Sequence, residues 1–260
     1  MANKNYKGRV PSLSRCVEIL DLVASRKQIT GADILESLAI PKSTLYVLLN
    51  AMEELGLVRK SEDGGRIQLG LKLMSLGQLA AERLDLREIA SPFMRALIET
   101  EPCYSSVLGI LDGDHAYYAV KVINSERGIT TISRVGQEIS LVRAGIGKCL
   151  LAFSPESMRE RLLPALDYHE VTETSITTAE ELRKELANIR LRGWALGNCE
   201  GERGVRSVAA PVFNACNAIE CAVSIEGPIN EFTDDKLEEI ALKVRQCAAG
   251  LTQALCGRAA

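Results

Sequence analysis

Residues 40–60 read "IPKSTLYVLLNAMEELGLVRK", a leucine-rich stretch that opens with a proline and two hydroxyl residues and closes with a glycine and a basic pair. Pro41 suits the first turn of a helix, where its missing N–H is not needed, and Gly56 suits the end. At about 100° per residue, the apolar side of this helix is expected to pack; it carries Leu45, Leu48, Leu49, Met52 and Leu55. The other side is expected to stay available for contact; it carries Ser43, Tyr46, Val47 and Asn50.

Two shorter helices are expected before this stretch and a hairpin after it. Ser12 or Ser14 is a candidate cap for the first helix and Thr30 for the second. Beyond Gly56, "LVRK", "SEDGG" and "RIQL" indicate two strands around a glycine-rich turn. Three short helices followed by a hairpin are the order of a winged helix-turn-helix.

In such a unit the third helix fits the major groove of DNA, where its polar residues reach base edges and its first N–H groups meet phosphate. The residues of suitable type in the helix are Lys42, Ser43, Thr44, Tyr46 and Asn50. Arg66 in the wing, with Arg59 or Lys60 beside it, suits flanking phosphates. The alternative is a helical unit that contacts another protein instead of DNA.

The composition allows two domains, because 260 residues with 47% hydrophobic and 25% charged content are typical of a soluble globular protein. No run of 18 uncharged apolar residues is present, and the N-terminal "MANKNYKGRVPS" has no apolar segment of a signal peptide. We therefore expect a cytoplasmic location. The net charge of -3 hides a basic surplus in residues 1–75, which is compatible with a nucleic-acid partner.

The sequence offers little support for a metal, a cofactor or an enzyme. The eight cysteines stand singly, without a CxxC pair, and there are only two histidines, His115 and His169. No GxSxG elbow and no acidic metal cluster are visible. We expect no catalytic residue, no bound metal and no cofactor.

The rest of the chain predicts an α+β domain built on an antiparallel sheet. Residues 70–86 are helix-like and are expected to form a rigid connection, followed by a helix from Ile89 to Thr100. A capping box from Thr178 to Glu181 opens a helix that stops at Gly193. The expected strands are "YSSVLGIL", "HAYYAVKV", "ITTISRV", "RSVAAPVF" and "AIECAVSIE", and an amphipathic helix ends the chain. A small ligand is expected between the sheet and the helices.

Three segments supply candidates for that pocket. "RAGIGKCLLAF" (143–153) fails the phosphate-loop pattern at Val142 and Cys149, but its glycines either admit a carboxylate to a helix start or serve close packing. In "GNCEGERGVRSVAAPV" (197–212), Val205 and Ser207 are pocket candidates. The neighbouring charges Glu200, Glu202, Arg203 and Arg206 are expected to pair among themselves as a solvated rim.

The third segment is "CAVSIEGP" (221–228), where Ser224 and Glu226 alternate to one face of a strand. A hydroxyl and a carboxylate there are able to bind a ligand, or Glu226 simply faces water.

These signatures together resemble the IclR family of bacterial transcriptional regulators, from about Ser12 to Gly257. The resemblance rests on "PKSTLYVLLNAMEELGLV" with "GGRIQLGLKLMSLG", then "AGIGKCLLA", then "GERGVRSVAAPVF" with "AVSIEGP". It implies a winged helix-turn-helix, a linker helix and a GAF-like domain that binds a small organic acid, in dimers or tetramers. By position, the family's effector pocket here involves Ile139, Leu141, Gly145, Ile146, Val205, Ser207 and Ser224, with Glu226 and Gly197 at its edge.

Several departures from the family pattern affect the expected contacts. Val47 stands where many members have an arginine, so this position of the DNA surface has lost or replaced a contact. In the effector domain, Val142 replaces a histidine, Arg143 replaces a small residue, and Glu226 replaces a small polar residue. The acidic run before the arginine motif reads Gly197-Asn198-Cys199-Glu200 here. The ligand is therefore expected to be larger, less acidic or even cationic.

The expected organisation is a tail (1–10), a winged helix-turn-helix (11–70), a linker helix (71–85) and a GAF-like effector domain (86–257). We expect a regulator, and a repressor in particular, that binds a pseudo-palindromic operator as a homodimer or homotetramer and senses a small organic acid. The alternatives are a ligand-sensing module that contacts protein without DNA, and a small-molecule enzyme.

Overall fold

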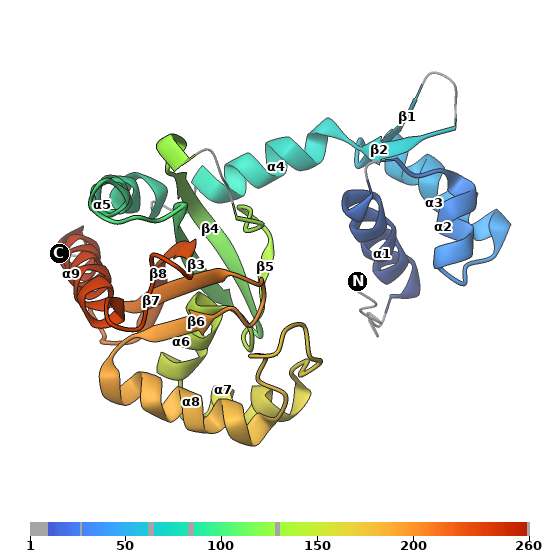
Figure 1. Cartoon of the computed structure of the whole chain (residues 1–260). Helices are drawn as coiled ribbons and strands as arrows, with labels where there is room; N and C mark the ends of the chain where they lie inside the picture. Colours follow the sequence, from blue (N-terminus) through green and yellow to red (C-terminus); the bar gives the residue numbers. More distant parts are fainter. Residues whose placement is uncertain (1–9, 27, 62–64, 83–85, 128–130, 259–260) are drawn as a thin grey trace. The chain divides into compact units, whose positions relative to one another are not determined.

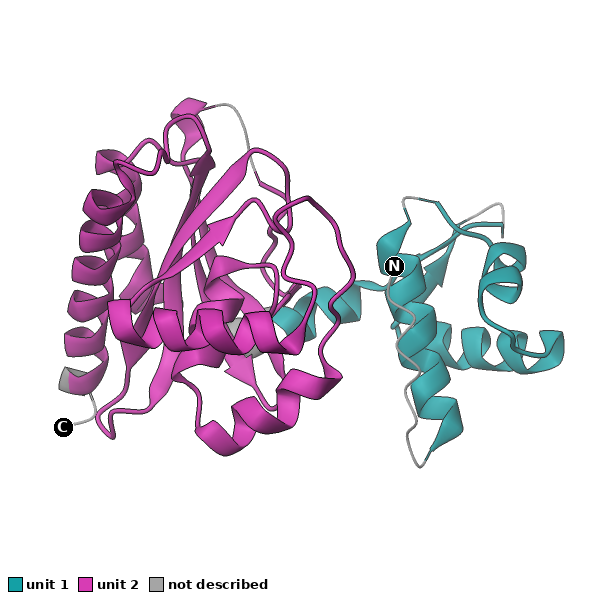
Figure 2. Cartoon of the chain, turned by 60° about the horizontal axis from the view of Figure 1, so that its bottom comes forward, with its two compact units in different colours: residues 1–83 teal, residues 84–260 magenta. Residues whose placement is uncertain are grey.

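The structure is a computed structural model that describes residues 10–26, 28–61, 65–82, 86–127 and 131–258. The chain divides into two compact units, residues 1–83 and residues 84–260 (Figure 2). Among these described residues, unit 1 has one hydrophobic core and unit 2 has two.

Unit 1 consists of helices around a small apolar core, with a two-stranded antiparallel hairpin beside them (Figure 1). Its elements are α1 (Pro11–Ser25), α2 (Gly31–Ser37), α3 (Lys42–Glu54), β1 (Val58–Lys60), β2 (Ile67–Leu69) and α4 (Leu71–Glu82). The winged helix-turn-helix order is therefore as predicted. The predicted linker helix extended to residue 85, and residues 83–85 lie outside the described part of the chain.

The ends of these helices follow local side-chain chemistry. Thr30 caps α2 as predicted: its hydroxyl accepts from the N–H of Asp33, and its own N–H donates to the Asp33 carboxylate at 2.8 Å. Gly56 follows α3 with a φ of 74°, the left-handed conformation that favours glycine. Two details differ. α1 starts at Pro11 rather than after a serine cap, and Pro41 is the residue before α3 rather than its first residue.

The hairpin is attached to the helices by backbone hydrogen bonds. The N–H of Ile67 donates to the carbonyl of Ile29 at 2.8 Å, and Thr30 and Arg66 form an antiparallel bridge. These contacts join strand β2 and Arg66 to the residues at the start of α2. They fix the position of the hairpin relative to the helices of unit 1.

Unit 2 is built on a six-stranded antiparallel sheet in the order β5-β4-β3-β8-β7-β6. The strands are β3 (Ser105–Asp112), β4 (His115–Ile123), β5 (Glu138–Ile139), β6 (Ala195–Asn198), β7 (Val205–Phe213) and β8 (Ile219–Pro228). The long β7–β8 and β3–β4 hairpins were expected from their alternating apolar residues, whereas no strand was expected at β5 or β6.

Helices cover both faces of this sheet (Figure 1). α5 (Leu86–Thr100) and α9 (Leu237–Arg258) pack on one face and enclose the larger core of unit 2. α6 (Gly145–Phe153), α7 (Glu156–Leu162) and α8 (Ala179–Arg192) lie on the other and enclose the second core. Short 3-10 turns, η1 (Ser125–Arg127) and η2 (Leu163–Ala165), complete the unit.

Two expectations for unit 2 are wrong. α5 begins at Leu86 rather than at Ile89. The segment "ITTISRV" was expected to be a strand, but residues 131–135 run as irregular backbone. Their β-branched and hydroxyl residues suit a strand, yet the Thr131 and Ser133 hydroxyls bind a buried carboxylate instead.

Candidate functional sites

The outward face of α3 carries the predicted DNA contacts. The side chains that are exposed are Lys42, Ser43, Tyr46, Val47 and Asn50, and Thr44 is half-buried. The inward face is held by Leu45, Leu49 and Met52, which are buried in the core of unit 1. Leu55 was expected to pack but is exposed, because the helix ends at Glu54 and the chain turns at Gly56. The polar flank of α3 is thus uncovered within its own unit.

Asn50 is held by side chains that the sequence did not connect with it. The Lys60 ammonium, on β1, donates to Asn50 Oδ1 at 2.8 Å and forms an ion pair with Glu53 Oε2 at 2.8 Å. The hydrogen bond from Lys60 lowers the pKa of the Glu53 carboxyl. The Lys60 bond falls on Oδ1 and does not use the amide nitrogen, so the Asn50 N–H groups can donate toward a base edge.

Arg66 lies on the exposed side of the wing, one residue before β2. Its backbone N–H donates to Ser61 Oγ at 3.0 Å, and its carbonyl accepts from the N–H of Ser61 at 2.9 Å. These bonds join the two strands of the hairpin at Ser61 and Arg66. The arginine side chain is therefore presented from an ordered strand end, as a phosphate contact requires.

In unit 2, a row of residues crosses four strands on the face that α6 covers. Ser105 is paired with Glu226, Glu226 with Ser207, and Ser207 with Gly197. The first turn of α6 packs directly on this row, since a Cβ at Gly145 would lie 2.7 Å from both the Gly197 nitrogen and Ser207 Oγ. Only glycine fits there, so the predicted residues Gly145, Ser207, Gly197 and Glu226 come together.

The apolar residues predicted for the pocket lie beside this row. Ile139 and Ile146 meet over Gly109, where an added Cβ would be 2.9 Å and 3.0 Å from their Cδ1 atoms. Leu141 is buried in the same core, and Val205 is half-buried.

Ser224 and Gly147 also belong to the segments that were predicted to line the pocket, but both make packing or hydrogen-bond contacts within the protein. The Ser224 hydroxyl, which is buried, donates to the carbonyl of Val208 at 2.9 Å within the sheet. Gly147 serves close packing, because a Cβ would lie 2.2 Å from the Ser140 carbonyl oxygen.

Around Glu226 the structure reveals a buried polar cluster that the sequence did not predict. Glu226 Oε2 accepts hydrogen bonds from the hydroxyls of Ser105, Thr131 and Ser133. Lys121 Nζ, on β4, donates to the carbonyl and hydroxyl oxygens of Thr131 and Ser133 at distances from 2.7 Å to 3.1 Å. The one signal available in the sequence was a lysine inside the apolar strand "HAYYAVKV".

Burial and charge shift the pKa values in this cluster. Burial lowers the pKa of the Lys121 ammonium, and the Glu226 carboxylate opposes that change. Burial raises the pKa of the Glu202 carboxyl, and the nearby Glu226 raises it further. The cluster therefore contains two carboxylates that repel one another, with Lys121 close to both.

The expected pairing within the rim is wrong: Arg203 is exposed but pairs with Glu173 at 3.0 Å, and two of the four charges are buried with partners distant in sequence. Glu200 is buried and forms an ion pair with Lys148, on α6. Arg206 is buried too; it binds Asp234 at 2.7 Å and the carbonyl of Phe232 at 2.8 Å. Lys148 thus holds α6 against the sheet edge instead of reaching a phosphate.

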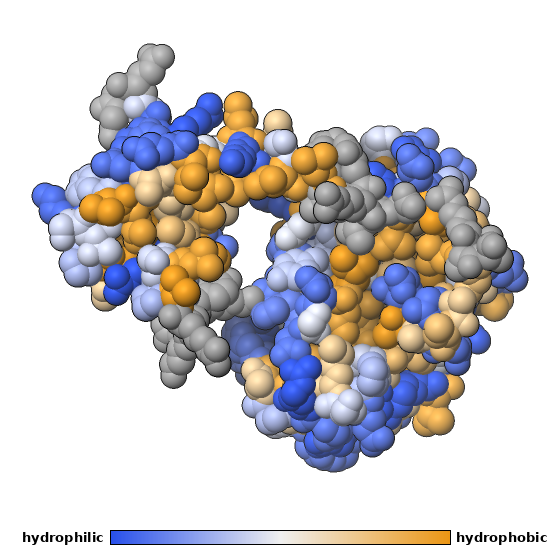
Figure 3. Space-filling view, turned by 180° about the vertical axis from the view of Figure 1, so that it is seen from behind, coloured by the Kyte–Doolittle hydropathy of each residue, from blue (hydrophilic) through white to orange (hydrophobic). Residues whose placement is uncertain are grey.

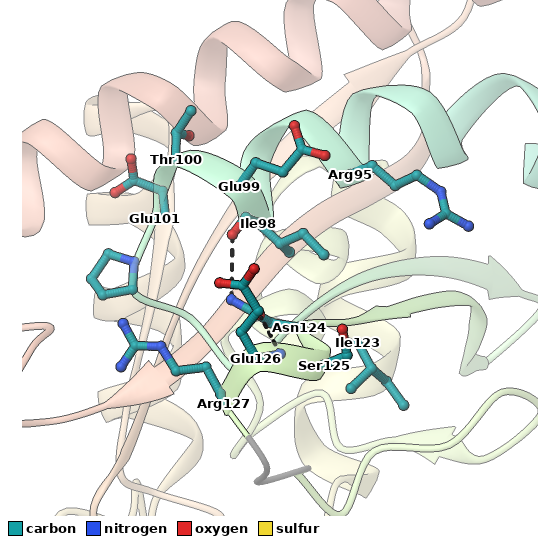
Figure 4. A pocket seen from close by; sticks show the side chains of 11 residues that line it. Arg95, Ile98, Glu99, Thr100, Glu101, Ile123, Asn124, Ser125, Glu126 and Arg127 are labelled. Atoms are coloured by element: carbon teal, nitrogen blue, oxygen red, sulfur yellow. Dashed lines mark hydrogen bonds between the residues drawn. The ribbon is translucent and has the colours of Figure 1, made fainter.

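Two surface hollows lie away from the predicted pocket. One of about 580 Å³ lies between the end of α5 and η1; there Asn124 donates to the Ile98 carbonyl at 3.4 Å (Figure 4). The other, of about 420 Å³, lies over the Lys148–Glu200 pair beside α8. Neither is lined by a predicted effector residue.

The fold and these sites define a regulator with a DNA-reading head and a separate sensing domain. Residues 12–62 match the model of the IclR helix-turn-helix domain, and residues 78–253 match that of the bacterial transcriptional regulator IclR C-terminal domain. The chain belongs to the IclR family of bacterial transcriptional regulators.

Relatives match over nearly the whole chain. The uncharacterized HTH-type transcriptional regulator RhmR of Escherichia coli K12 is 37% identical over 95% of this chain and 94% of its own length. The transcriptional repressor IclR of the same organism is 27% identical over 96% of this chain and 92% of its own. The crystal structure of Thermotoga maritima IclR aligns with a TM-score of 0.71 at 30% identity, over 94% of this chain and 98% of that one.

Family membership confirms the predicted resemblance, the α+β fold and the prediction that the chain is a regulator rather than an enzyme. It decides against the alternative of a sensing module without DNA binding. Within the described residues, no helix is long and apolar enough to cross a membrane.

Proposed function

We propose that this chain, an IclR-family DNA-binding regulator with an effector-binding domain, represses transcription from a pseudo-palindromic operator in response to a small organic acid. Repression is supported by similarity to the Escherichia coli repressor. The observation that supports sequence reading most directly is the uncovered flank of α3, with Tyr46 and Asn50 exposed beside a buried inner face.

Two DNA-binding domains are expected to bind together, because a single recognition helix reads only a few base pairs. α4 offers a surface for this pairing, because several of its large apolar side chains are exposed, and hydrophobic residues line this segment on the face shown in Figure 3. The exposed side chains are Leu71, Met74, Leu76 and Leu79. Exposed apolar side chains grouped on one helix are typical of an interaction site, so we propose that α4 contributes to a homodimer.

We propose that the effector binds where the first turn of α6 meets the row containing Ser207 and Glu226. No side chain caps α6 at Ala144, so its first N–H groups remain for an acceptor. Backbone N–H groups and the helix dipole favour a carboxylate there. Ile139 and Ile146 supply the apolar wall.

Replacing Asn50 by alanine tests the reading role of α3. We expect affinity for an operator selected from random duplexes to fall by about 10-fold or more, because a base contact is worth about 1–3 kcal/mol. Affinity for unselected duplex should change little. Fluorescence anisotropy at several salt concentrations measures both, and Tyr46→Phe reports on the hydroxyl alone.

The matched control is Leu55→Gln, which alters the exposed residue directly after the C-terminal end of the same helix. Equal losses on selected and unselected duplex for Asn50→Ala would show that this side chain does not read sequence.

A further inference from the structure

The Glu226 carboxylate has acceptor capacity that the protein does not use. The side chain is only 8% exposed, and three hydroxyls, from Ser105, Thr131 and Ser133, all donate to Oε2. No hydrogen bond from the described residues falls on Oε1. A carboxylate accepts hydrogen bonds and cannot donate them, so a ligand group that meets Oε1 has to be a donor.

Lys121 does not supply the missing donor. Its ammonium has three N–H groups, and they face four oxygens of Thr131 and Ser133. It therefore reaches Glu226 only through hydroxyl groups. Glu202 adds a second carboxyl nearby, where the N–H of Ile132 is its backbone donor. The cluster has more acceptors than donors.

The unused acceptor of Glu226 lies close to the N-terminus of α6. Glu226 is paired with Ser207 on the next strand, and Gly145 packs against Ser207. Paired residues on neighbouring strands are about 4.5–5.5 Å apart. One small molecule can therefore place a carboxylate at α6 and its opposite end at Glu226.

We infer that the effector is a small carboxylic acid whose opposite end donates hydrogen bonds through hydroxyl or ammonium groups, and that Glu226 is the residue that selects it. This inference rests on the proposed effector pocket. An acid that ends in a methyl group leaves Oε1 desolvated and unpaired, so it should bind weaker on the order of 10- to 100-fold.

Six-carbon acids that differ mainly at the far end test the inference on the full chain. Calorimetry with hexanoate, 6-hydroxyhexanoate, 6-aminohexanoate and gluconate should give at least one donor-bearing acid that binds about 10-fold or more tightly than hexanoate. The tighter of the hydroxyl and ammonium probes identifies the kind of donor. Hexanoate binding as tightly as every other probe would overturn the inference.

Glu226→Gln keeps the side-chain shape and removes the charge, so the preference should shrink to about threefold or less. Glu220→Gln is the matched control on the same strand; Glu220 is exposed and accepts from Asn214 at 3.1 Å, and this variant should discriminate like the wild type. The wild-type series decides the matter even if Glu226→Gln fails to fold.

The two proposals fail in different ways. If hexanoate binds as tightly as the others and Ser207→Ala abolishes that binding, the pocket stands and the donor requirement is wrong. If none of the four acids binds the wild type, acid sensing at this site fails, and the inference with it.

Discussion

At the residue scale, the pair of Lys148 and Glu200 shows how much depends on one contact. The two side chains are 2% and 5% exposed, and Glu200 Oε2 also accepts from the N–H of Asn198 at 2.8 Å. Burial of two charges costs several kcal/mol each, which only close pairing offsets. The pair fixes α6, and with it the Gly145 turn of the proposed pocket.

We expect Lys148→Ala to destabilise unit 2 by about 3–5 kcal/mol, because Glu200 is then buried without a counter-charge. The double variant Lys148→Met with Glu200→Gln should recover most of the loss, since the glutamine can still accept from Asn198. Urea unfolding followed by the fluorescence of Trp194, the single tryptophan and a buried residue of unit 2, measures both. A double variant no more stable than Lys148→Ala would show that the ion pair is not the cause.

Residues that act through near neighbours were predictable from the sequence, and those with distant partners were not. Thr178 with Glu181 and Gly193 at φ 81° delimit α8 as expected, because a cap involves residues three or four apart. Glu200 was assigned to its neighbours in "CEGER", yet its partner is 52 residues away. The Glu226 cluster joins five segments of the chain, and only the fold brings them together.

At the scale of elements, the start of α2 combines a helix cap with the base of the wing. The Thr30 hydroxyl donates to the Asp33 carboxylate at 2.7 Å, and this is the main reason that the pKa of Asp33 is lowered. A carboxyl with a lowered folded pKa stabilises the fold above its unfolded pKa of about 3.9. That contribution is lost as the pH falls through the lower folded value.

We therefore expect Thr30→Val to raise the pKa of Asp33 toward its ordinary value and to reduce the acid sensitivity of unit 1 that depends on this carboxyl. An NMR titration of the Asp33 carboxyl carbon, compared with the exposed Glu36 on the same helix as an internal control, measures the change. An Asp33 pKa that is the same in both proteins would contradict the assigned role of the Thr30 hydroxyl.

α4 is the element on which the proposed homodimer depends. Replacing Leu76 and Leu79 by lysine should produce monomers at micromolar concentration in sedimentation experiments. Operator affinity should fall on the order of 100-fold, because the second head no longer binds as part of the same particle.

Leu191→Lys is the control for this variant, because Leu191 on α8 is 87% exposed and takes no part in the proposed dimer. If the oligomeric state and the operator affinity of the α4 variant are unchanged, α4 does not form the dimer contact.

At the scale of the whole molecule, a regulator requires that ligand in unit 2 changes DNA binding by unit 1. Such a coupling is reciprocal: the factor by which effector changes operator affinity equals the factor by which operator changes effector affinity. Typical values correspond to about 1–3 kcal/mol, or roughly 5- to 150-fold.

The most direct measurement is the operator dissociation constant of the full chain without and with a saturating concentration of the acid that binds most tightly. We expect a change of about 5-fold or more, in either direction, that requires a higher acid concentration in Ser207→Ala but not in Ser157→Ala, a variant at an exposed site on α7. An operator affinity that is identical with and without bound acid would contradict the account.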